Sequence, residues 1–262
     1  MSTSTDRSAS PPITLAVITG GSRGLGKSMA LCLADHGVDS VITYKSAERE
    51  AREVVSAIEQ KGRKAAALQL DVAGAAGFAA FSERLAATLK STFGRDRFDA
   101  LVNNAGMGVH APFAETTEAQ LDELYAVHLK APFLLTQRLL PLLADGGRIL
   151  NVSTGLTRFS FPGYSAYAAM KGAVEVLTRY QAKELGGRGI SVNTLAPGAI
   201  ETDFGGGAVR DNPGLNQMIA AQTALGRVGL PDDVGGAVAL LLAPEGRWIN
   251  AQRIEVSGGM AL

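Results

Sequence analysis

Thr19-Gly20-Gly21-Ser22-Arg23-Gly24-Leu25-Gly26 is the stretch that decides the fold of this chain. It follows an apolar, β-branched run and precedes an amphipathic segment. Gly20 permits a tight turn, while Gly24 and Gly26 let the backbone approach a ligand and let a helix begin close to a strand. Free N–H groups and the helix dipole at such a helix start attract a pyrophosphate. The stretch therefore predicts a strand, a phosphate-binding turn and a helix.

Outside this stretch, short apolar runs alternate with longer amphipathic segments. We expect strands at 13–19, 41–44, 65–70, 100–102, 148–152, 190–195 and 253–256, and helices at 24–37, 47–60, 77–93, 117–143, 165–185 and 231–242. The helix at 117–143 should open with a capping box of Thr117 and Gln120 and bend at Pro132. The alternation predicts an α/β fold with a doubly wound, Rossmann-type parallel sheet and helices on both faces. We expect one domain over 13–262, preceded by a flexible polar tail at 1–12.

Composition limits the classes of partner. Hydrophobic residues make up 46% of the 262 residues, and 25 basic residues balance 25 acidic ones. Nothing in this balance favours a nucleic acid or an anionic membrane. No apolar run is long enough to span a bilayer, and Cys32 is the single cysteine. We expect a cytoplasmic protein that has no disulfide within the chain and acts on a small molecule.

Tyr167 and Lys171, in the sequence YAAMK, form a second informative pair. Residues four apart share one face of a helix, so a phenol and an ammonium should lie side by side. A nearby positive charge favours the phenolate, so we expect Lys171 to lower the pKa of Tyr167. A tyrosine tuned in this way can exchange a proton near neutral pH.

These motifs, in this order, carry a family resemblance. The turn has the spacing TGxxxGxG, and Asn104-Ala105-Gly106 and YAAMK follow it. The chain resembles the short-chain dehydrogenase/reductase family over essentially its whole length after the tail, and the 3-oxoacyl-acyl-carrier-protein reductases in overall pattern. The resemblance implies hydride transfer between a nicotinamide cofactor and a ketone or secondary alcohol. It makes a 3-oxoacyl thioester the first substrate to consider, and it implies a homo-oligomer, either a tetramer or a dimer.

The resemblance also implies a cofactor site drawn from several segments. Its residues would be Gly20, Ser22, Arg23, Gly24, Leu25, Gly26, Tyr44, Lys45, Asp71, Val72, Asn104, Ala105, Gly106, Tyr167, Lys171, Pro197, Gly198, Ile200 and Thr202. Asp71 could instead cap a helix, and the asparagines at 103 and 104 could be turn residues.

Charge at the end of the second strand bears on the choice of cofactor. An NAD site usually offers a carboxylate there, whereas a 2′-phosphate needs a cation. The strand ends Thr43-Tyr44-Lys45-Ser46 without an acid, and Arg23 lies in the turn. This favours NADP(H) over NAD(H), although either cation could be an ordinary surface residue.

The same resemblance assigns the chemistry. Tyr167 would be the acid/base, and Lys171 would bind the nicotinamide ribose. The family usually has a serine thirteen residues before the tyrosine; Thr154 stands there, and Ser153 is the alternative. No metal site is expected.

His128 marks a second departure from the family pattern. The family commonly has an asparagine in the long central helix, beside a kink that holds a water of the proton relay; His128 stands there instead. It could support that water, act in the relay by titrating near neutrality, or be tolerated because a backbone carbonyl holds the water.

Two further segments concern the substrate and the alternatives. Residues 203–217 are rich in glycine and polar residues and predict a mobile flap over the substrate. Phe159, Phe161 and Tyr164 could line an apolar pocket or pack as core. His128 and Thr154 leave room for a cofactor sensor or scaffold with weakened catalysis, and a sugar or steroid alcohol dehydrogenase would differ only in substrate.

Overall fold

The computed structural model describes residues 12–262, and seven parallel strands form its one sheet, in the order β3-β2-β1-β4-β5-β6-β7. The strands are β1 (Leu15–Ile18), β2 (Asp39–Tyr44), β3 (Ala65–Gln69), β4 (Phe98–Asn103), β5 (Leu143–Val152), β6 (Ser191–Pro197) and β7 (Arg253–Val256). The predicted tail lies outside the described residues except for Pro12.

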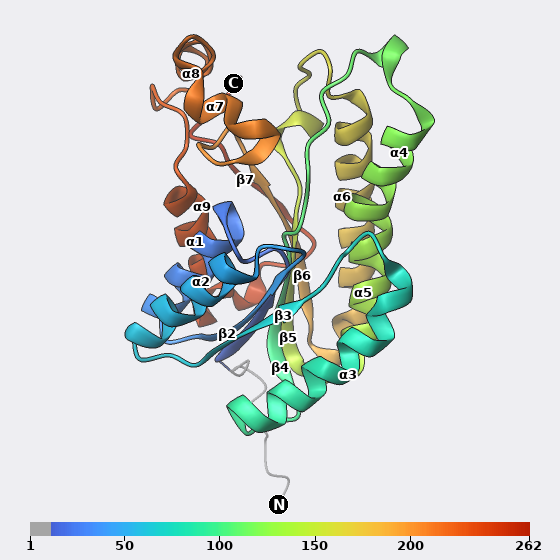
Figure 1. The fold of residues 1–262 in the computed structure, drawn as a ribbon, viewed down its shortest axis with the longest axis vertical. Coiled ribbons are helices and arrows are strands. Elements are labelled where there is room, and N and C mark those ends of the chain that lie inside the picture. The colour runs from blue at the N-terminus through green and yellow to red at the C-terminus, as the bar shows by residue number, and fades with distance from the viewer. Residues whose placement is uncertain (1–11) are drawn as a thin grey trace, which may run out of the picture.

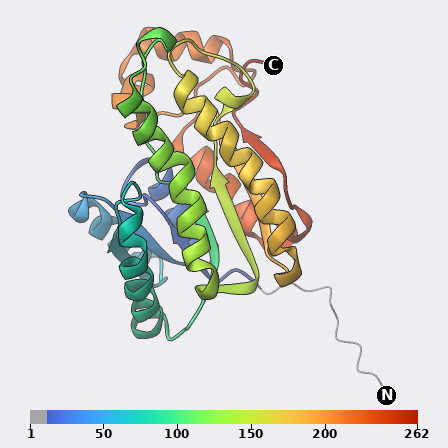
Figure 2. The same ribbon diagram turned by 90° about the vertical axis from the view of Figure 1, so that its right-hand side faces the viewer.

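Helices cover both faces of the sheet (Figures 1 and 2). One face carries α1 (Gly24–Asp35), α2 (Glu48–Gln60) and α9 (Pro231–Leu242). The other carries α3 (Phe78–Thr88), α4 (Glu118–Tyr125), α5 (Ala131–Leu139) and α6 (Ser165–Leu185). Two short helices, α7 (Ala208–Asp211) and α8 (Pro213–Ala221), lie beyond the carboxyl ends of the strands. The predicted doubly wound parallel sheet is confirmed.

The central strand β1 shows why both faces are covered. All four of its residues are buried, and successive side chains of a strand point to opposite faces. Ala16 and Ile18 belong to a core cluster that includes Met29 of α1. Leu15 and Val17 belong to a second cluster with apolar residues of α3 and α5. A continuous apolar run therefore becomes a strand between two cores.

The chain order of the strands reverses at β1, which lies between β2 and β4. Ile18 pairs with Val102, so the glycine-rich turn after β1 and the Asn104 segment after β4 leave the sheet side by side. Ligands of open parallel sheets bind at such a switch point, outside the carboxyl ends of the strands.

The long central helix differs from the prediction. It consists of α4, a π-helical segment at Ala126–Lys130, and α5. The irregularity thus precedes Pro132, which lies in the first turn of α5, where its missing N–H costs little. The predicted end at Leu143 is wrong, because Leu143 begins β5. The capping box of Thr117 and Gln120 is confirmed by both of its hydrogen bonds.

Residues 203–217 contain more regular structure than the predicted flap. Gly205, Gly206 and Gly207 each have positive φ, and α7 and α8 follow them. We call residues 203–221 the cap. None of the helices in residues 12–262 combines the length and apolarity needed to cross a membrane.

Candidate active site

The glycine-rich turn forms a tight cradle at the switch point. Gly20 has a φ of +68°, and a Cβ there would lie 2.9 Å from the Cα of Ala105. A Cβ on Gly26 would lie 2.7 Å from Nδ2 of Asn104. α1 begins at Gly24, and its N-cap residue, Arg23, makes no side-chain capping bond. The N–H groups of the first turn of α1 are therefore free to bind an anion such as a phosphate.

The segment after β4 fixes the shape of this cradle. The hydroxyl of Thr19 accepts hydrogen bonds from the backbone N–H groups of Asn104 and Ala105, each at 3.0 Å. Nδ2 of Asn104 donates to the carbonyls of Thr19 at 2.9 Å and Gly20 at 3.2 Å. Asn104 thus holds the turn in place through its amide.

Two exposed cations stand at the rim of the cradle. Lys45 Nζ lies 3.0 Å from Oδ2 of Asp71, and Arg23 lies 4.0 Å from Asp203, with the two cationic side chains 67% and 70% exposed. Asp71 also accepts a hydrogen bond from the N–H of Ala73 at 3.0 Å, so it closes a turn rather than capping a helix. Exposed ion pairs are weak, so a phosphate can replace these carboxylates.

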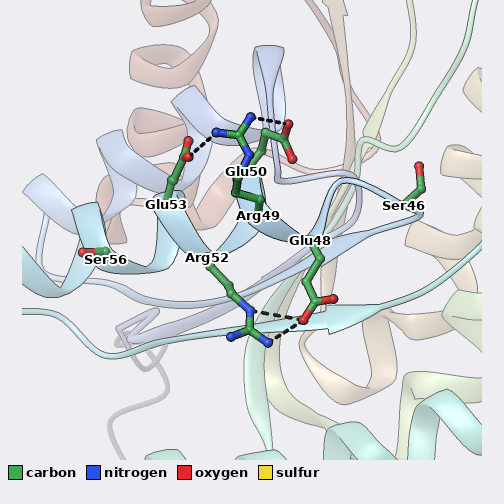
Figure 3. A pocket seen from close by; sticks show the side chains of 7 residues that line it. All are labelled: Ser46, Glu48, Arg49, Glu50, Arg52, Glu53 and Ser56. Carbon is green, nitrogen blue, oxygen red and sulfur yellow. Dashed lines mark hydrogen bonds and ion pairs between the residues drawn. The ribbon is translucent and has the colours of Figure 1, made fainter.

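The other arginines nearby are engaged with acids. An open hollow runs along the outside of α2 from Ser46 to Ser56 (Figure 3). In it, Arg49 bonds to Glu50 and Glu53, and Arg52 bonds to Glu48. The acids and arginines of this helix face neutralise one another, and the residues that line the hollow do not include Tyr167 or any other expected site residue.

Tyr167 and Lys171 lie buried in the first turns of α6, with 6% and 5% exposure. Lys171 Nζ donates to the carbonyl of Val152 at 2.7 Å and lies 5.8 Å from the centre of the Tyr167 ring. Burial raises the pKa of Tyr167 and lowers the pKa of Lys171 to about 7. The expected lowering of the Tyr167 pKa by Lys171 is absent, because burial dominates and the ammonium is held on a strand carbonyl.

The structure separates the two hydroxyls at the end of β5. Ser153 Oγ donates to Oε1 of Glu175 at 2.7 Å, which turns it toward α6. Thr154, in contrast, lies close enough to the Tyr167 phenol for its hydroxyl to lower the pKa of Tyr167, in opposition to burial. Thr154 is thus the one that the fold brings to Tyr167.

His128 is buried against Tyr167 from the π-helical segment, with 1% exposure. The two rings meet edge to face, 5.1 Å between centres. Nε2 lies 2.7 Å from the carbonyl oxygen of Met107, which requires a proton on Nε2, and Nδ1 has no partner among residues 12–262. Burial, and then the charge of Lys171, lower the pKa of His128 to about 2. Titration near neutrality is therefore wrong, and Nδ1 is an acceptor.

Gly106 makes room for the His128 ring, because a Cβ at residue 106 would lie 2.9 Å from Cε1. The Pro197–Thr202 segment reaches the cradle from β6. Gly198 donates to the carbonyl of Val256 at 3.0 Å, and Thr202 is the nearest neighbour of a Cβ built on Gly24, at 3.7 Å. The segment thus reaches the start of α1 through Thr202.

The remaining expected cofactor residues lie around the same cradle. Ser22 is buried, Leu25, Tyr44, Val72 and Ile200 are half-buried, and Ile200 bridges to Gly229.

Two aromatic side chains that the sequence analysis did not single out, Phe204 and His110, contact Tyr167 and the expected Tyr164. Phe204 of the cap lies 5.7 Å from the Tyr167 ring, and its ring occupies the space a Cβ on Gly108 would need. His110 meets Tyr164 edge to face at 5.1 Å. Gly108, in the loop after β4, was the available sequence signal for the Phe204 contact, because a side chain at residue 108 would overlap the Phe204 ring.

Phe159 and Phe161 instead pack on each other and against Ile219 of α8, as core beneath the cap. Within residues 12–262 no group of His, Cys, Asp and Glu side chains could hold a metal ion.

Comparisons with known proteins define the class. Residues 20–261 match the family model described as enoyl-(acyl carrier protein) reductase. The chain belongs to the short-chain dehydrogenase/reductase family, a family of oxidoreductases.

Three individual proteins are among the most similar. The hydroxynaphthalene reductase-like protein Arp2 of Metarhizium brunneum is 36% identical over 94% of each chain. The reductase LugOII, described as promiscuous and as catalysing keto-reduction at C1 during lugdunomycin biosynthesis, is 39% identical with a TM-score of 0.89, over 96% of this chain and 98% of its own. The angucycline C-6 ketoreductase LanV, solved with bound NADP, is 34% identical with a TM-score of 0.90, over 95% of each chain.

Proposed function

We propose that this protein is an NADP(H)-dependent ketone reductase in which Tyr167 supplies the proton. The observation that carries the proposal is the buried group of Tyr167, Thr154 and Lys171 beside an uncapped helix start. NADPH, when bound, supplies the hydride that the ketone carbon receives.

The cradle fits a dinucleotide phosphate on two grounds. A Cβ at Gly20 or Gly26 would collide with the Ala105 or Asn104 segment, so the backbone N–H groups stay open to a ligand. Arg23 and Lys45 would hold the 2′-phosphate, since their partners are exposed carboxylates that a phosphate can displace. This supports NADP(H) over NAD(H).

The chain's own residues would handle the proton as follows. Thr154 and Tyr167 donate hydrogen bonds to the carbonyl oxygen and so stabilise the charge that develops there. Tyr167, kept neutral by burial, then donates its proton to the alkoxide, which is a far stronger base than a phenolate. Lys171, buried behind the phenol, would bind the nicotinamide ribose.

His128 would serve this transfer by holding a water. Its Nδ1 is an acceptor without a partner in the described chain, and a buried polar atom of that kind normally binds water.

Two substrate classes follow. A 3-oxoacyl thioester is the first, from the overall sequence pattern. A flat aromatic ketone is the second, and the aromatic contacts of Phe204 with Tyr167 and of His110 with Tyr164 support it, because aromatic rings pack well against a planar molecule. The similarity to the hydroxynaphthalene reductase-like protein Arp2 supports the second class, because a hydroxynaphthalene is a flat aromatic compound.

The discriminating experiment measures NADPH consumption with acetoacetyl-coenzyme A and with 2-tetralone. Tyr167→Phe should lower kcat at least about 100-fold, as expected on removal of a general acid. Tyr180→Phe, on the exposed side of the same helix, is the matched control and should leave kcat unchanged. Tight NADPH binding without turnover of any ketone would favour a cofactor sensor or scaffold instead.

We also propose that the protein is a cytoplasmic homo-oligomer, a tetramer or a dimer. Leu240, Trp248 and Leu262, on and after α9, are 70%, 95% and 96% exposed. Large apolar side chains exposed to this degree support a subunit contact.

A further inference from the structure

A carboxylate on the helix that carries Tyr167 and Lys171 binds the segment that carries Thr154. Glu175 lies one turn beyond Lys171, and its side chain is 15% exposed. Its Oε1 accepts hydrogen bonds from Ser153 Oγ at 2.7 Å, Thr157 Oγ1 at 2.7 Å and Arg253 Nε at 2.9 Å. The three donors come from both sides of Thr154 and from β7.

Arg253 also holds the backbone of the turn at residues 153–157. Its Nη2 donates to the backbone carbonyl of Thr154 at 3.2 Å, and Thr157 Oγ1 lies 2.9 Å from the same carbonyl. We call Ser153, Thr157, Glu175 and Arg253 the Glu175 clamp. The clamp restrains Thr154 through its backbone carbonyl and through Ser153 and Thr157 on either side of it, and none of these hydrogen bonds engages the Thr154 hydroxyl.

The clamp is anchored to the C-terminal segment. Arg253 Nη1 donates to Glu255 at 2.8 Å, and Glu255 also pairs with Arg158, whose guanidinium reaches the carbonyls of Met260 and Ala261. The Arg158 guanidinium, with help from Arg253, lowers the pKa of Glu255 to about 2. Glu255 stays ionised at any physiological pH, so the anchor keeps its charge.

We propose that Glu175 and Arg253 are positioning residues that set the distance between the Thr154 hydroxyl and the Tyr167 phenol. The inference rests on the proposed ketone reduction. Thr154 lies in the turn after β5, whereas Tyr167 lies on α6, so a link between this turn and α6 is needed to hold both hydroxyls on one carbonyl oxygen. Half-buried, charge-assisted hydrogen bonds are the strong links available for this. A displacement of about 1 Å in such a site can cost about 100-fold in rate.

The test uses the full chain with NADPH and 2-tetralone. Glu175→Leu should lower kcat about 10- to 100-fold and change the KM for NADPH far less, because no hydrogen bond of the clamp reaches the phosphate-binding turn at residues 19–26. Glu175→Gln, which keeps an acceptor oxygen, should restore part of kcat. Glu184→Leu, exposed on the same helix, is the control and should match the unaltered protein.

A double-mutant cycle separates positioning from general stability. In a Thr154→Val background the Glu175→Leu change should lower kcat less than about twofold, because the hydroxyl it positions is gone. A full additional loss in that background would overturn the proposal. So would an unchanged kcat for Glu175→Leu in a protein that Tyr167→Phe inactivates.

Hydrogen exchange gives a readout that needs no turnover. The backbone N–H groups of residues 153–158 should exchange at least about tenfold faster in Glu175→Leu, while those of residues 19–26 stay unchanged. Equal exchange at 153–158 would refute the clamp even if no ketone is reduced. If Tyr167→Phe retains full turnover, the proposed function fails, and the exchange result still decides the clamp.

Discussion

Burial of Lys171 should lower the free energy of unfolding, by an amount that depends on pH. Its pKa falls from 10.5 to about 7 on burial. A group that ionises less readily when folded destabilises the native state fully below the folded pKa, and the penalty disappears as pH rises toward the unfolded pKa. At about 1.4 kcal/mol per pH unit, the penalty at pH 7 is about 5 kcal/mol.

Lys171→Met removes this penalty but also a hydrogen bond. Losing the donor leaves the carbonyl of Val152 unpaired, which costs about 1–3 kcal/mol. The net effect at pH 7 should be a gain of about 2–4 kcal/mol in the free energy of unfolding. At pH about 10 the charge penalty is under about 1 kcal/mol, so the same variant should be less stable than the unaltered protein.

Urea unfolding of both proteins at the two pH values measures the change. Lys183→Met, exposed near the end of the same helix, is the control and should show no such reversal. The reasoning is refuted if Lys171→Met is destabilised equally at both pH values, because the lysine would then be charged and paired at neutral pH.

Three further changes test the cofactor site and the assembly. Gly26→Ala should abolish NADPH binding, measured by fluorescence titration, because its Cβ meets Nδ2 of Asn104; binding within about twofold of normal would contradict the cradle. Replacing Arg23 and Lys45 together by Ser should raise the Kd for NADPH at least about tenfold and leave that for NADH unchanged; an equal loss for both cofactors would argue against a 2′-phosphate contact. Trp248→Glu should lower the mass measured by sedimentation, since a charge at a subunit contact is costly; an unchanged mass would move the interface elsewhere.

The sequence predicted the elements whose ends carry local signals. The observed bounds of α6, α9 and β7 are those predicted, and Pro231 at the start of α9 illustrates why, since proline favours the first turn of a helix. Composition and periodicity did not predict the π-helical segment at Ala126–Lys130, which looks like ordinary helix in its composition; only the family resemblance pointed to a kink beside His128. The sequence analysis did not predict helix α8, because the three glycines at 205–207 that precede it indicated a loop.

The residues of the site likewise divide into those with a local sequence pattern and those without one. The Tyr167–Lys171 pair and the glycine-rich turn are each local patterns, so the spacing of residues within each pattern was enough to predict it. The Glu175 clamp joins residues 22 and 78 positions apart, and no local pattern connects Glu175 to Ser153 or Arg253. The sign of the Tyr167 pKa shift also depends on burial, which follows from the packing of the cap and the His128 ring rather than from the spacing to Lys171.

Because Phe204 of the cap contacts the Tyr167 ring, the cap contributes to the environment that sets the pKa of the proton donor. Phe204 belongs to the cap, and its ring is one of the neighbours that keep the Tyr167 phenol buried and therefore protonated. An open cap would hydrate the hydroxyl and make it easier to ionise. With the cap in place, the phenol keeps its proton until a base as strong as an alkoxide is present beside it.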